Sequence, residues 1–187
     1  MLSKISAFIL FNILGFKIIG DWPKVKKFVL IAIPHTSNWD FPMGIMIRSI
    51  LKRDIKYFAK DSLFKTPLAG FFRWTGGVPV DRSKKNNFVD AVVDIYDSHE
   101  EFAVCIAPEG TRKKVDKLKT GFYYIARGAK APIVMITFDW AKKQFVISDA
   151  FYTTDDKEAD FEFIRGFFEG VRGKVPENGW GILPTDH

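Results

Sequence analysis

The sequence contains little cysteine and no long uninterrupted apolar run. Its one cysteine, Cys105, excludes an internal disulfide and fits a reducing compartment. Residues 2–19 are largely apolar, but Lys4, Asn12 and Lys17 interrupt them, whereas a bilayer-spanning helix needs about 20 mostly apolar residues. No clear small-residue cleavage site follows this segment, and the chain shows no repeat, linker or low-complexity stretch. These absences point away from a secreted disulfide scaffold and from an integral membrane protein.

The composition is that of a globular protein with an excess of basic residues. Of the 187 residues, 47% are hydrophobic and 27% are charged, which suits one domain spanning residues 1–187. A formal charge of +6 and a pI near 9.3 favour anionic partners such as phosphorylated metabolites, acidic lipid headgroups or nucleic acid. Because no base-stacking aromatic motif is present, we do not expect nucleic acid to be the partner.

Apolar runs and helical periodicities alternate along the chain. Strands are expected at residues 16–19, 27–33, 55–59, 78–80, 101–107, 132–138 and 144–148. Helices are expected at residues 2–11, 39–51, 61–73, 86–99, 118–129 and 155–171. This alternation predicts a single α/β domain with a central, largely parallel or mixed sheet flanked by helices.

The segment 34–40, Pro-His-Thr-Ser-Asn-Trp-Asp, holds the first candidate site. His35 leaves the apolar strand 27–33, and Asp40 falls in the first turn of the next expected helix. A carboxylate at this spacing can hold one imidazole nitrogen as N–H and leave the other free to accept a proton. A buried histidine with a purely structural role would show the same pattern.

Three polar clusters each follow the carboxyl end of an expected strand. They are His35 with Asp40, Asp81 with Arg82, and residues 109–112. In open α/β sheets ligands bind outside these strand ends, so parallel strands would bring the clusters to one rim. Arginine offers a planar fork of donors suited to phosphate, although Arg82 beside Asp81 can equally form a surface ion pair.

The candidate base has no obvious nucleophile of its own. Ser37 lacks the Gly-x-Ser-x-Gly turn of a hydrolase serine. Cys105 lies inside an apolar strand, where a buried packing role is expected. A base without a nucleophile indicates that the substrate supplies one, most simply a hydroxyl.

Four short sequence blocks, in this order, resemble the glycerolipid acyltransferases, the family that includes lysophosphatidic acid acyltransferase. The blocks are His35 with Asp40; residues 77–82, Gly-Val-Pro-Val-Asp-Arg; residues 108–112, Pro-Glu-Gly-Thr-Arg; and Pro132 in an apolar strand. The motif-bearing core covers residues 28–138. Ala107 departs from the pattern, because an aromatic residue usually precedes Pro-Glu-Gly.

The resemblance implies a glycerol-3-phosphate acyltransferase-like fold and transfer of a fatty acyl group to a lysophospholipid hydroxyl. The acyl donor would be a thioester of coenzyme A or acyl carrier protein, acting as co-substrate, with no cofactor and no metal. His35 would take the hydroxyl proton and Asp40 would orient the imidazole. The resemblance assigns the acceptor phosphate to Arg82 and the rest of the acceptor site to Glu109, Gly110, Thr111 and Arg112.

Several alternatives remain open at this point. Residues 1–12 are expected to form a helix that either packs on the domain or lies on an anionic membrane surface; in the second case the protein would be peripheral at the cytoplasmic face. His35 could instead activate water, which would make the protein a thioesterase or lipase-like hydrolase. A non-catalytic lipid-binding module is the third reading.

Overall fold

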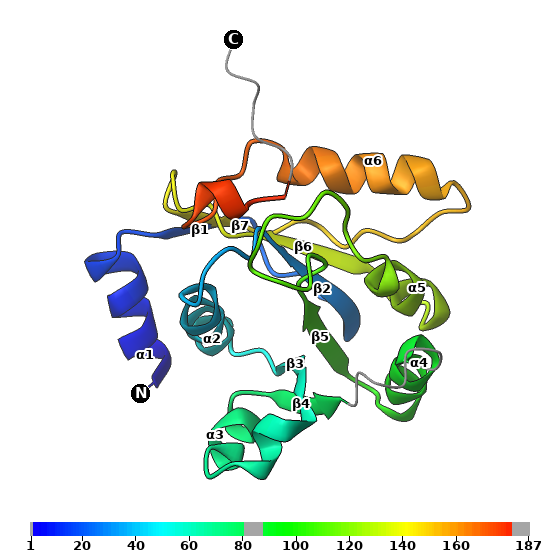
Figure 1. Ribbon diagram of the computed structural model, residues 1–187, viewed down its shortest axis with the longest axis horizontal. Coiled ribbons are helices and arrows are strands. Elements are labelled where there is room, and N and C mark those ends of the chain that lie inside the picture. Colours follow the sequence, from blue (N-terminus) through cyan, green and yellow to red (C-terminus); the bar gives the residue numbers. More distant parts are fainter. Residues whose placement is uncertain (1, 81–87, 181–187) are drawn as a thin grey trace.

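The computed structural model describes residues 2–80 and 88–180 of the chain. Its centre is a sheet of five strands in the order β4-β3-β5-β2-β6, and every neighbouring pair is parallel (Figure 1). The predicted α/β fold with a parallel sheet is therefore confirmed. The strands are β2 (Lys27–Ile33), β3 (Ile55–Lys60), β4 (Gly77–Val80), β5 (Phe102–Ile106) and β6 (Ile133–Thr137).

Helices cover both faces of this sheet. In Figure 1, α1 and α2 lie on one side of the sheet and α4 and α5 on the other. The helices are α1 (Leu2–Ala7), α2 (Asp40–Leu51), α3 (Ala69–Trp74), α4 (Phe88–Ser98), α5 (Gly121–Gly128) and α6 (Lys157–Phe168). Three shorter helical segments are η1 (Phe8–Ile13), η2 (Asp61–Lys65) and η4 (Pro176–Asn178), and a small second sheet pairs β1 (Lys17–Ile19) with β7 (Gln144–Val146) in parallel.

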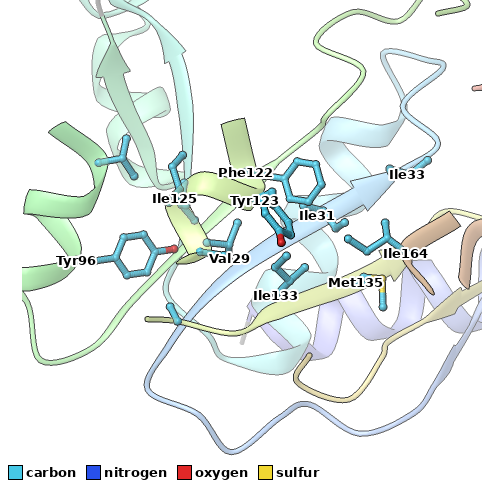
Figure 2. Packing of buried hydrophobic residues seen from close by; sticks show 14 of the residues in the cluster. Val29, Ile31, Ile33, Tyr96, Phe122, Tyr123, Ile125, Ile133, Met135 and Ile164 are labelled. Atoms are coloured by element: carbon cyan, nitrogen blue, oxygen red, sulfur yellow. The ribbon is translucent and has the colours of Figure 1, made fainter. Parts of the chain in front are cut away.

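The central strand β2 carries apolar side chains to both faces, as expected for a strand covered twice. Val29, Ile31 and Ile33 pack with α4, α5 and α6, whereas Phe28 and Leu30 pack with α2 and β7. Figure 2 shows the first of these two cores, in which side chains of β2, β6 and α5 fill the space between helices and sheet. These two cores hold β2 rigidly, and β2 leads directly into the candidate site.

The expected helix at 61–73 is interrupted in the structure. A tight helical turn, η2, ends at Lys65, and the α-helical part, α3, begins only at Ala69. Thr66 between them is extended (φ −98°, ψ 165°), because the ring of Pro67 disfavours helical geometry in the preceding residue. The proline should have divided the predicted helix.

The first helix also differs from the simple pattern. After Ala7 the backbone widens into the π-helical segment η1, with a hydrogen bond from Leu14 N to Ile9 O. Leu10 is fully buried against α2, whereas Leu2 and Ile5 are about half exposed. The amino-terminal helix therefore packs on the domain through one face and leaves apolar side chains uncovered on the other.

Candidate active site

Three loops meet because β2, β5 and β6 are parallel neighbours. Ile31 on β2 lies opposite Ile106 on β5, and Ile33 lies opposite Thr137 on β6. The chain therefore leaves all three strands at the same edge of the sheet. His35, Glu109 and Trp140 follow these three strand ends within a few residues, so the topology brings them together.

The structure places His35 and Asp40 in contact. His35 Nδ1 lies 3.3 Å from Asp40 Oδ2, and the Asp40 side chain is only 2% exposed. The same oxygen accepts hydrogen bonds from the backbone N–H groups of Thr36 (2.9 Å) and Ser37 (2.8 Å). The carboxylate is thus fixed by the loop that carries the imidazole, and Nε2 is the ring nitrogen that Asp40 does not engage.

Trp140 holds the second oxygen of Asp40. Its indole Nε1 donates to Asp40 Oδ1 at 3.3 Å. The backbone N–H of Trp140 donates to Arg172 O at 2.8 Å, and the ammonium of Lys174 lies 4.3 Å from the centre of the Trp140 ring. Residues 172–174, which follow α6, therefore hold Trp140 in place, and Trp140 in turn positions the Asp40 carboxylate.

Sequence reasoning missed Trp140, which lies one hundred positions after Asp40. The signal was available, because the tryptophan follows the carboxyl end of an expected parallel strand. The three polar clusters predicted from the sequence do not include this strand end, although an indole N–H can also position a carboxylate.

Glu109 lies behind His35 rather than in the open site. Its Oε2 accepts the backbone N–H of His35 at 2.7 Å, and its Oε1 has no hydrogen-bond partner among the described residues. Burial raises the pKa of Glu109 to about 7, the hydrogen bond from His35 lowers it in part, and the nearby charge of Asp40 raises it further. Glu109 thus ties the β5 loop to the backbone of His35.

The other residues of the Pro-Glu-Gly-Thr-Arg block face a cavity. Gly110, Thr111 and Arg112 line it, together with Lys119. Gly110 has a positive φ of 67°, a backbone conformation that favours glycine, and the Lys119 side chain packs directly over it, with the ammonium 2.5 Å from the position of a built Cβ. Lys119 is a second cation at the site that sequence reasoning did not single out.

Asp81 and Arg82 lie outside the described residues. Strand β4, which leads to them, is parallel to β3 and ends at Val80 on the same edge of the sheet as the other strands. The phosphate-binding role assigned to Arg82 therefore stays a prediction.

The cavity is large and mainly apolar, with a volume of about 1130 Å³. It runs from His35 and Asp40 between α2 and the sheet. Apolar wall residues include Leu30, Ala32, Phe41, Ile45, Ile47, Ile55, Phe58, Ala59, Leu63, Phe72, Phe88 and Phe138. A long hydrocarbon chain fits such a wall. His35, Asp40, Thr111, Arg112 and Lys119 are polar lining residues that follow the carboxyl ends of β2 and β5, whereas Arg48 and Lys56 line the cavity near the start of β3.

Cys105 forms part of the same cavity wall. Its partial exposure is toward the cavity, and burial raises the pKa of its thiol to about 12. A thiol with this pKa is protonated at neutral pH and is therefore a poor nucleophile. The packing role expected from the sequence agrees with this environment.

Within residues 2–80 and 88–180, no group of three or more His, Cys, Asp or Glu side chains is arranged to hold a metal ion. Over the same ranges, no helix has both the length and the apolar character required to cross a bilayer.

Comparison with known proteins identifies the class. A family model described as Acyltransferase matches residues 18–139, which is more than half of the chain, so the chain belongs to the acyltransferase family. The fold is similar to the crystal structure of the 1-acyl-sn-glycerophosphate (LPA) acyltransferase, PlsC, from Thermotoga maritima. The TM-score is 0.61 over 89% of this chain and 74% of that one, at 18% sequence identity, which shows a shared fold. No curated protein sequence matched the chain.

Proposed function

We propose that this acyltransferase moves a fatty acyl group from a thioester of coenzyme A or acyl carrier protein to a hydroxyl of a lysophospholipid such as lysophosphatidic acid. The observation that carries the proposal is the His35–Asp40 pair at one end of a large apolar cavity. An acyl chain in that cavity would have its carbonyl beside a base. Family membership supplies the class of reaction.

His35 is the general base in this scheme. Nε2 takes the proton of the acceptor hydroxyl as its oxygen attacks the thioester carbonyl, and Asp40 stabilises the imidazolium that forms. The new C–O bond forms and the C–S bond breaks. The thiolate then leaves and receives the proton from the imidazolium. Proton and electron pairs balance without a cofactor or a metal.

The cations at the cavity end are suited to an anionic acceptor. Arg112 and Lys119 both line the cavity near His35, and Arg82 is expected to bind the acceptor phosphate by resemblance. Arginine can bind phosphate through two parallel hydrogen bonds, whereas lysine acts as a point charge. A phosphate held by these groups would present the nearby glycerol hydroxyl to the imidazole.

The acceptor and the amino-terminal helix indicate action at a membrane surface. Leu2, Ile5 and Phe8 are 47%, 49% and 59% exposed, although each is a large apolar side chain. Such side chains on a surface helix can enter the headgroup region of a bilayer. We therefore propose that the protein is peripheral on an anionic membrane; its location at the cytoplasmic face is part of the same proposal.

A matrix of acyl thioesters against lysolipids tests the proposal. Wild type and His35→Ala are compared, with His99→Ala as a matched control, because His99 is exposed and bonds locally to Ile95 O. We expect at least one donor–acceptor pair to give an ester product that is lost in His35→Ala and kept in His99→Ala. Arg82→Ala should lose most activity with phosphate-bearing acceptors while remaining folded.

Two results would favour other functions. If the thioester released its thiol equally fast with and without any lysolipid, a hydrolase would be indicated. If His35→Ala retained full lipid binding and biological activity, the chain would act as a binding module.

A further inference from the structure

A row of exposed apolar side chains runs along α3. Leu68, Phe71 and Trp74 are 60%, 47% and 60% exposed. Residues three apart lie on the same face of a helix, and the Phe71 and Trp74 ring centres are 6.2 Å apart. We call these three residues the α3 face.

The α3 face lies within a basic stretch of the chain. Residues 52–74 contain six basic and two acidic side chains. Lys60 ends β3 and directly precedes η2. Arg73 on α3 stacks over the ring of Phe64 on η2, and both cations are exposed. Apolar side chains flanked by cations match a surface of anionic lipid headgroups.

The same pair of helices also forms one wall of the cavity. Phe72, next to Phe71 on α3, lines the cavity, and so does Leu63 on η2. The segment 61–74 therefore has apolar side chains exposed on the surface and other apolar side chains that line the cavity. A bilayer touching the α3 face would lie directly against the outside of the cavity wall.

We propose that the α3 face is a lipid-contacting surface, distinct from the amino-terminal helix, that docks the enzyme on an anionic bilayer. This inference rests on the proposed function, because a lipid acceptor has to reach the cavity from the membrane. The surface would hold the η2–α3 wall of the cavity against the headgroups, so that acyl chains enter from the bilayer.

Vesicle flotation with full-length protein tests the proposal. Phosphatidylglycerol vesicles serve as the anionic surface and phosphatidylcholine vesicles as the neutral one. The test variants are Leu68→Ser/Trp74→Ser and Lys60→Gln/Arg73→Gln. The matched control is Tyr152→Ser, which removes a 59% exposed aromatic side chain outside the cavity lining.

We expect the apolar double variant to bind anionic vesicles at least about tenfold more weakly, and the charge variant to lose about tenfold on anionic vesicles alone. Brominated lipids should quench wild-type tryptophan fluorescence, and Trp74→Phe should remove part of that quenching. Unchanged binding of the apolar variant, or quenching unaffected by Trp74→Phe, would overturn the proposal. So would a stable dimer in solution that Leu68→Ser/Trp74→Ser dissociates, because a second copy of the chain would then cover this face.

Activity in solution separates this inference from the proposed function. With a water-soluble short-chain thioester and lysolipid and no vesicles, Leu68→Ser/Trp74→Ser should match wild type. It should fall behind only when the acceptor is in vesicles. Absence of acyl transfer by wild type in both formats would refute the proposed function, whereas equal losses for the variant in both would refute only the docking role.

Discussion

The pKa of Glu109 provides a quantitative test of the site. Glu109→Gln keeps the shape of the side chain and an oxygen that can accept the backbone N–H of His35, but it removes the ionisable group. Burial raises the pKa of Glu109 from its ordinary 4.5 to about 7 in the folded chain. The substitution should therefore change how stability depends on pH.

The sign follows from linkage between protonation and folding. Below pH 4.5 the carboxyl is protonated in both the folded and the unfolded chain. Between 4.5 and about 7 the unfolded chain releases a proton that the folded chain retains, so rising pH favours unfolding. At about 1.4 kcal/mol per pH unit, this range corresponds to about 3 kcal/mol of folding free energy lost by wild type. The glutamine variant does not undergo this loss.

Urea unfolding followed by tryptophan fluorescence, repeated from about pH 4 to pH 8, measures the effect. We expect the free energy of unfolding of Glu109→Gln minus that of wild type to increase by about 3 kcal/mol across this range. Taking the difference cancels the titration of groups that do not interact with Glu109. Glu177→Gln, which removes an exposed carboxylate, should show a much smaller change. If this difference in the free energy of unfolding stayed constant or fell with rising pH, the pKa of Glu109 would not be raised by burial.

Three further predictions concern catalysis. Trp140→Phe removes the donor to Asp40 Oδ1 and should lower kcat about tenfold or more with little change in KM, whereas Trp180→Phe, away from the cavity, should leave kcat unchanged. Asp40→Asn should lower kcat by about a thousandfold or more, because the imidazolium loses its carboxylate, with circular dichroism confirming that the variant is folded. Gly44→Leu should shift kcat/KM toward shorter acyl thioesters, because Gly44 lines the cavity and a Cβ there meets only Phe138 at 3.9 Å; an unchanged chain-length profile would contradict the acyl-binding role of the cavity.

The fold was largely predictable because its signals are local and strong. The apolar run at 27–33 is a strand buried on both faces, and it is followed at once by polar residues. Each expected strand in the five-stranded sheet exists, and the parallel direction of the strands follows from the helices between them. The order of the strands in the sheet is not encoded in this alternation. The break in the helix expected at 61–73 also has a local cause, because Pro67 keeps Thr66 out of helical geometry. The apolar periodicity of this segment did not reveal the break.

The site was predictable only where its residues share one loop or one recognisable block. His35 and Asp40 are five residues apart, so their contact could be expected from spacing. Trp140 reaches Asp40 from a segment one hundred positions away, and Lys119 folds back over Gly110 through the loop that follows β5. The position of Glu109 behind His35 likewise depends on how two loops pack, which no spacing along the chain encodes.

The most direct test measures ester formation and thiol release in one reaction of an acyl thioester with a lysophospholipid. We expect that wild type forms one ester for each thiol released and that thiol release depends on the lysolipid. We expect His35→Ala neither to form the ester nor to release the thiol. Thiol release without ester formation, or full ester formation by His35→Ala, would contradict the assignment of His35 as the base that activates the acceptor hydroxyl.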